Sequence, residues 1–139
     1  MSGVTSREAN VFACLVDTVV APGGALPPLA RTDAMQFLDR YLAASPRVNR
    51  IGVRALLHAL EVGPRLLGYG ARLRGLPVER RLAFLDAVGR SAAGPVLQGV
   101  EVMAKMAYYG DDGVMRSLGY DPDAVVARAR EVRVAEGRW

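Results

Sequence analysis

Apolar side chains recur at intervals of three and four residues along almost the whole chain, the spacing that places them on one face of an α-helix. No run of alternating apolar and polar residues is flanked by hairpin turns, so the pattern does not indicate a β-sheet. The sequence therefore predicts an all-α fold, a single-domain bundle of about six or seven helices spanning residues 1–139.

Capping and breaking residues divide this pattern into segments. Thr5 with Glu8 three residues later forms a capping box, which predicts a first helix over residues 5–21. Proline and glycine then predict a loop over residues 22–31.

The second helix is expected to begin at Thr32 or Asp33. Ser45–Pro46 is an N-cap followed by a proline at the first helical position, and it opens the third helix. That helix should end or kink at Gly63–Pro64, because proline lacks the amide donor and clashes with the preceding turn. The side chains expected to face inward are Met35, Leu38 and Leu42, followed by Val48, Ile51, Ala55 and Leu56.

Four more helices complete the pattern. They should begin near Leu76–Pro77, at Pro95, at Asp111 or Asp112, and at Asp121–Pro122. We expect Leu82, Leu85 and Val88 to be buried in the fourth helix. The fifth runs through Val96, Val100, Met103 and Ala107 to Tyr109, the sixth ends at Gly119, and the last has the apolar stripe Val125, Ala129 and Val132.

The composition is unusually apolar for a small chain, with 51% hydrophobic residues and a mean hydropathy of +0.15. Aromatic residues make up only 6%, so most of this content is alanine, valine and leucine. Such a chain favours an exposed apolar patch that faces a partner. A tightly packed alanine-rich monomer is the alternative.

The net charge is +4, and every cation except Lys105 is an arginine. Eight arginines lie between Arg47 and Arg81, against two glutamates, and Arg47, Arg50 and Arg54 form a helical stripe. This basic patch fits an acidic partner surface, a phosphate or nucleic acid. It fits a solvated helix face equally well.

A single cysteine excludes an intramolecular disulfide and a cysteine metal site. Cys14 is expected to be a small buried hydrophobe. Residues 11–21 resemble a signal-peptide core, but Asp17 interrupts them, Glu8 precedes them, and Arg7 is the only cation ahead of them. No apolar run reaches the roughly 18 residues of a membrane span. We therefore expect a cytoplasmic protein.

Candidates for chemistry are few. His58, the only histidine, lies in an apolar helical run and is expected to be a hydrogen-bonded core residue, although a dyad with Cys14 stays open. Gly68–Gly70 lacks the third glycine and the preceding strand of a dinucleotide fingerprint. Asp111–Gly113 lacks the spaced ligands of a calcium loop. No catalytic, cofactor-binding or metal-binding residue is assigned.

Tyrosines and methionines gather around the predicted sixth helix. Both residue types are enriched where one protein docks on another, so they form a candidate partner interface. An ordinary hydrophobic cluster at a helix corner is the alternative. The candidate residues are Met103, Met106, Tyr108, Tyr109, Met115, Leu118 and Tyr120, together with the terminal Trp139.

Five segments of the chain, in order, carry a resemblance to a known family. They are Ser6–Ala9 with Leu15–Pro22, Phe37–Leu42, Arg54–Glu61, Leu76–Arg81, and Ala107–Asp111 through Leu118–Pro122. Together they resemble the small accessory subunit (subunit 3) of gluconate 2-dehydrogenase-type flavoenzymes. They cover most of residues 5–122, and residues 123–139 lie outside the resemblance. Similar helices resemble the N-terminal region of long-chain alcohol oxidases.

The resemblance implies a non-catalytic small subunit that stabilises, matures or escorts a separate large subunit, an alcohol or sugar dehydrogenase or oxidase. FAD is expected in that partner and no cofactor in this chain. Many relatives in this family are exported, which differs from the cytoplasmic location expected here. Two other hypotheses stay open: a stand-alone helical protein that binds an anionic ligand or nucleic acid through its basic patch, and a small enzyme built around His58.

Overall fold

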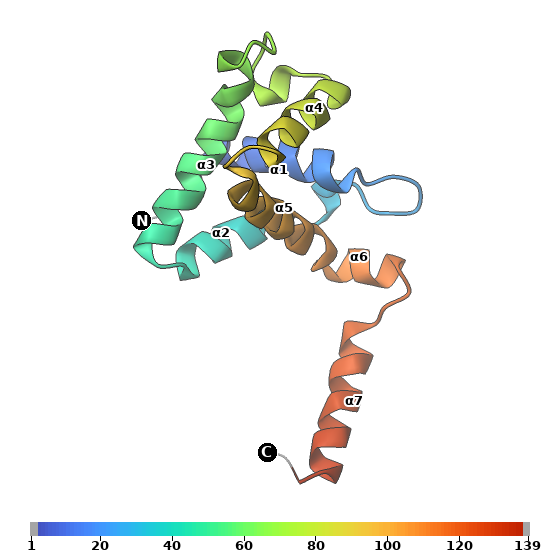
Figure 1. Cartoon of the computed structure of the whole chain (residues 1–139). Helices are drawn as coiled ribbons and strands as arrows, with labels where there is room; N and C mark the ends of the chain where they lie inside the picture. The colour runs from blue at the N-terminus through green and yellow to red at the C-terminus, as the bar shows by residue number, and fades with distance from the viewer. Residues whose placement is uncertain (1–2, 138–139) are drawn as a thin grey trace.

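The computed structural model describes residues 3–137, and within them it contains seven α-helices, two short 3₁₀ turns and no strand (Figure 1). The predicted all-α fold is therefore confirmed. In chain order the elements are α1 (Ser6–Val20), η1 (Leu29–Arg31), α2 (Ala34–Ala44), α3 (Arg47–Leu66), η2 (Leu73–Gly75), α4 (Val78–Gly89), α5 (Gly94–Tyr109), α6 (Asp112–Ser117) and α7 (Pro122–Ala135).

The first helix is the centre of the bundle, since α1 contacts α2, α3, α4 and α5. Its start follows the prediction: the Thr5 hydroxyl accepts a hydrogen bond from the Glu8 amide at 3.2 Å, and the Glu8 carboxylate accepts one from the Thr5 amide at 2.9 Å. This reciprocal pair satisfies two amide groups that a helix start otherwise leaves unpaired. The loop that follows α1 leads into η1 and α2.

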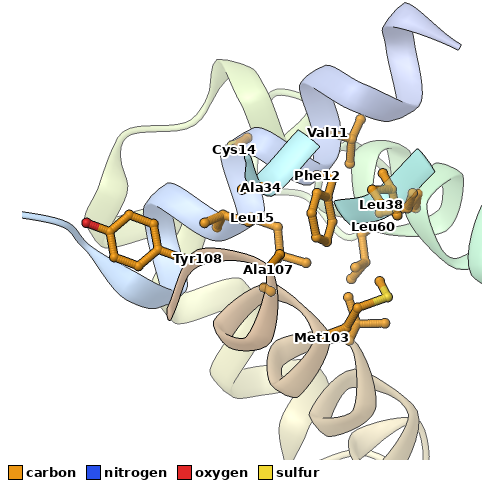
Figure 2. Close-up of a cluster of buried hydrophobic side chains, with 14 of the residues drawn as sticks. Val11, Phe12, Cys14, Leu15, Ala34, Leu38, Leu60, Met103, Ala107 and Tyr108 are labelled. Atoms are coloured by element: carbon orange, nitrogen blue, oxygen red, sulfur yellow. The ribbon is translucent and has the colours of Figure 1, made fainter. Parts of the chain in front are cut away.

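The hydrophobic core lies between α1 and α5 (Figure 2). Phe12 is fully buried near the middle of the labelled cluster, among Met103 and Ala107 of α5, Leu38 of α2 and Leu60 of α3. Cys14 is buried, as expected for a small hydrophobe. The helices are therefore held together mainly by aliphatic side chains, with Phe12 among them on the central helix.

The third helix turns a different face to the core than the pattern predicted. Val48 and Ile51 are 79% and 59% exposed and Ala55 is exposed, so the prediction that they face inward is wrong. Leu57, Leu60 and Pro64 are buried instead, and Leu56 is half-buried. The reason is that α3 has apolar residues on two faces, and only one of them can pack against α1.

Pro64 does not end α3, which continues to Leu66. The amides of Leu67 and Tyr69 donate to the carbonyl oxygens of Gly63 and Pro64, both at 2.9 Å, which closes the helix beyond the proline. At Gly63 an added Cβ would lie 3.1 Å from the Phe84 ring, so this glycine lets α4 approach α3 closely. Position 63 thus has a packing role.

Helix α4 buries Phe84 and Leu85 and half-buries Val88, whereas Leu82 is 49% exposed, against the prediction. In α5 the expected positions Val100, Met103 and Ala107 are buried and Val96 is exposed. A helix of this size shows the core only part of its circumference, and residues at the edge of the apolar face stay in solvent.

The last helix stands apart from the bundle. Asp111 and Asp121 cap α6 and α7 as predicted, through bonds to the amides of Val114 and of Asp123 and Ala124. Helix α7 then extends away from the other helices (Figure 1), and it buries none of its residues. Among the described residues, no helix is long and apolar enough to cross a membrane.

Candidate functional site: the tyrosine corner and two buried carboxylates

The tyrosine corner, residues 103–120 around the turn at Gly110, divides into a buried part and an exposed part. Tyr108 is fully buried, and its hydroxyl donates to the carbonyl oxygen of Pro27 at 2.6 Å. Figure 2 shows its ring at one edge of the core cluster, with the hydroxyl directed away from Phe12. Burial raises the pKa of the Tyr108 hydroxyl, and Tyr109 and Asp111 add to the effect. Tyr108 therefore anchors the loop after α1 to α5.

Asp111 connects two helix starts. Its Oδ1 accepts from the Val114 amide at 3.0 Å and caps α6, while its Oδ2 accepts from the Asp33 amide at 2.9 Å, just before α2. A carboxylate at a helix N-terminus is favoured both by the unpaired amides and by the helix dipole. The sequence indicated the first contact and gave no signal for the second, because the partner lies 78 positions away.

Four of the candidate side chains are open to solvent and form the exposed part of the corner. We define the exposed corner as Met106, Tyr109, Leu118 and Tyr120, which are 57%, 40%, 58% and 47% exposed. Met115 is half-buried, and Met103 belongs to the core. Trp139, the last candidate, lies outside the described residues. Of the eight predicted interface residues, four are thus large apolar side chains open to solvent.

The Glu8 carboxylate joins the start of α1 to α3. Glu8 is buried, and its Oε1 lies 3.6 Å from Arg54 Nη1 and 3.5 Å from His58 Nε2. Arg54 also donates to the Gly3 carbonyl oxygen at 2.9 Å. Burial raises the pKa of Glu8, but the hydrogen bonds with Thr5 and the charges of Arg54 and His58 outweigh it, and the pKa lies below its usual value. The carboxylate is therefore held in its charged form.

Glu61 is the second buried carboxylate, and it joins α3 to η2. Its Oε1 accepts from Arg74 Nε at 2.9 Å, and its Oε2 has no hydrogen-bond partner in the described part of the chain. Arg81 donates to the carbonyl oxygens of Leu73 and Arg74 and thereby holds the η2 turn in place. The segment after α3 thus folds back onto it through arginine side chains.

These contacts leave fewer arginines available to the predicted basic patch. Arg54 binds Glu8 and Gly3, Arg74 binds Glu61, and Arg81 binds backbone carbonyl groups, so three of the eight arginines serve the fold. Arg47 is exposed and Arg50 half-buried. The stripe Arg47, Arg50 and Arg54 is therefore not a row of equivalent solvent-facing cations, because its last member lies on the inner side of α3.

His58 is not the core residue that the pattern predicted. Its side chain is 45% exposed and lies beside Glu8. Cys14 is buried, and burial raises the pKa of its thiol, an effect only partly offset by the charge of Arg81, so the reactive thiolate is disfavoured. The paired partner of His58 is thus a carboxylate that the helix cap already uses, which leaves the dyad hypothesis without support from this geometry.

A shallow cleft of about 770 Å³ lies between the end of α1, α4 and α5. Its charged lining residues are Asp86, Arg90, Glu101 and Lys105, two acids and two bases, and Arg90 pairs with Asp86. No group of three or more His, Cys, Asp or Glu side chains in residues 3–137 could hold a metal ion. The cleft shows no preference for one sign of charge.

The Gly68–Gly70 turn, considered above as a nucleotide motif, has a structural role. Both glycines have positive φ, at 84° and 89°, which residues with a Cβ adopt only at a cost. Tyr69 between them packs edge-on against Phe84 at 5.5 Å, and the Arg80 guanidinium lies 5.8 Å from the Tyr69 ring centre. This turn reverses the chain and adds one aromatic ring to the core.

Comparison with known proteins assigns no family and no function to this chain. No family model matches the chain, and neither a curated protein nor a solved structure does.

Proposed function

We propose that this chain is a non-catalytic small subunit that binds and stabilises a separate FAD-dependent alcohol or sugar dehydrogenase or oxidase. The observation that carries the proposal is the exposed corner, Met106, Tyr109, Leu118 and Tyr120. It lies at the end of the segments that resemble the accessory subunits. Methionine and tyrosine on a solvent-facing surface are typical of interface centres.

The ionisable residues support the same proposal. Glu8 and Glu61 are engaged in helix capping and ion pairs, and the Cys14 thiol is buried. General acid–base catalysis needs a group with an accessible proton next to a substrate. A role in which this chain supplies a surface, and the partner supplies flavin and chemistry, fits the side chains that the fold leaves accessible.

Co-expression with a large flavoprotein of this class, chosen from a neighbouring gene, tests the proposal. Binding to the folded flavoprotein and not to its unfolded chain should raise that protein's soluble yield and flavin content by mass action. The two proteins should co-elute in size-exclusion chromatography, and this chain alone should show no oxidoreductase activity and no visible chromophore. A flavoprotein that is equally soluble, flavin-loaded and active without this chain would contradict the proposal.

Within such a complex we expect the exposed corner to matter more than the arginines. Tyr109→Ala should weaken binding by about 2 kcal/mol, roughly a 30-fold rise in Kd, because buried aromatic anchors dominate interfaces. Arg47→Glu combined with Arg50→Glu should change it by less than about 1 kcal/mol, since exposed ion pairs contribute little. Isothermal titration calorimetry measures both.

Arg54 is left out of the charge-reversal variant because it pairs with buried Glu8, and its loss would disturb the fold. Tyr41→Ala is a matched control for Tyr109→Ala, since Tyr41 is also exposed, at 38%, but lies on α2. If the double arginine variant abolishes binding while Tyr109→Ala has no effect, the basic patch is the interface. The prediction that the exposed corner contributes more than the arginines is then wrong.

A further inference from the structure

An apolar groove of about 500 Å³ is open to solvent between α2, α3 and α5. One wall is formed by Val48, Gly52 and Leu56 of α3, and the other by Val96, Gly99 and Met103 of α5. Val48 and Val96 are 79% and 56% exposed. This groove includes part of the α3 face that the hydrophobic pattern predicts to be buried.

Two glycines mark the walls of this groove. Gly52 and Gly99 lie inside long helices, where glycine is less favourable than alanine. At each of the other helical glycines an added Cβ would have an atom of this chain within 4 Å, whereas nothing lies within 4 Å at Gly52 or at Gly99. The fold of one copy therefore has no need of either glycine, and a backbone that approaches from outside would.

Helix α7 has an apolar stripe that packs against no other described element. Val125, Ala129 and Val132 follow one face of it, and all three are exposed. Among residues 3–137 its main contact is with α6, and it extends away from the bundle (Figure 1). A 14-residue helix without a packed face gains little stability from its own sequence.

The dimensions of the two features agree. Val125 to Val132 spans seven residues, about 10.5 Å along the helix axis at 1.5 Å per residue. The groove walls, from Val96 to Met103 and from Val48 to Leu56, span about 10.5 and 12 Å by the same measure. Three anchors on α7 therefore cover the length of the groove.

We propose that α7 of one copy occupies this groove in a second copy, and that the second copy returns its own α7, which gives a symmetric dimer. Such an exchange fills both open grooves and covers both free helices with a single two-fold axis. It is the helix-in-groove mode of recognition, with anchors at i, i+4 and i+7. The proposal concerns copies of this chain and is independent of the flavoprotein.

Light scattering coupled to size-exclusion chromatography of the full chain tests the exchange. The wild-type protein should have twice the 14.9 kDa mass of one chain. Gly52→Leu with Gly99→Leu fills the groove, and Val125→Glu with Val132→Glu removes the anchors. Each pair should raise the dimer Kd by about 30-fold or more, as expected for the loss of central contacts.

Two further measurements distinguish the exchange of α7 from other causes of a weaker dimer. The groove variant keeps a normal α7 and the α7 variant keeps a normal groove, so a mixture of the two should form a mixed dimer through one helix–groove pair. Ala83→Leu with Ala87→Leu adds the same two leucines on exposed positions of α4 and should leave the dimer unchanged. Circular dichroism should show that all variants keep their helix content.

The proposal is overturned if the wild-type chain is a monomer, as it would be if the groove served a helix of a different protein. A groove variant that remains dimeric, or variants that fail to complement each other when mixed, would overturn it too. The Gly→Leu helices should be at least as stable as wild type against heating, because leucine is the better helix former.

Discussion

Phe12→Ala should lower the free energy of unfolding by about 4 kcal/mol. Phe12 is fully buried on the central helix α1, between residues of α2, α3 and α5. Truncation of a buried phenylalanine costs about 3–5 kcal/mol, since the lost apolar contacts are joined by the free energy of the cavity that remains. Total stability of a domain is about 5–15 kcal/mol, so urea unfolding followed by circular dichroism should show a large shift of the midpoint.

Phe37→Ala is the matched control for this substitution. Phe37 lies on α2, is half-buried and stacks on Tyr41 with the ring centres 6.2 Å apart. Because water already reaches part of the ring, we expect a loss of about 1 kcal/mol. Equal effects of the two substitutions would show that the core between α1 and α5 is packed less tightly than the structure indicates.

Arg74→Met should cost about 2–3 kcal/mol at neutral pH. It leaves the Glu61 carboxylate buried, with its one strong partner removed and with Oε2 already unpaired among the described residues. Breaking a buried pair from one side costs about 3–5 kcal/mol, and the partial exposure of the Arg74 side chain reduces that figure. Urea unfolding followed by circular dichroism at neutral pH measures the loss.

Two variants check this explanation. Arg72→Met removes a neighbouring exposed arginine and should change stability by less than about 0.5 kcal/mol. Glu61→Leu combined with Arg74→Met removes both charges and should recover most of the loss, because a hydrophobic pair often replaces a buried ion pair without cost. A double variant that is as unstable as Arg74→Met alone would show that the ion pair is not the cause.

Local signals in the sequence located the helices well. The capping box at Thr5 and the caps at Asp111 and Asp121 are all present at the predicted positions. Pro95 occupies the first turn of α5. These signals work from sequence because a cap and its amide donors lie within three residues of one another, so no distant part of the chain is needed to form them.

The orientation of α3 was not predictable in the same way. Its sequence places apolar residues on two faces, and the pattern favoured Val48 and Ile51 for the core. The structure buries Leu57 and Leu60 on another face, together with the charged Glu61. That face can be buried because Arg74, 13 residues further along the chain, pairs with Glu61. Periodicity contains no information about such a pairing, so it could not choose between the two faces.

In the candidate site, too, the sequence indicated the residue types but not which side chains are buried. Composition and the Tyr108–Tyr109 pair indicated an aromatic corner, but not which of the two rings is buried. Tyr108 is buried because the Pro27 carbonyl oxygen, 81 positions earlier, accepts its hydroxyl proton in a hydrogen bond, and Tyr109, one position on, is turned to solvent. By itself, then, the sequence determined the helical content, the helix starts and the presence of surplus apolar surface. Tertiary structure decided which apolar faces are covered, since each depends on partners brought together from distant positions.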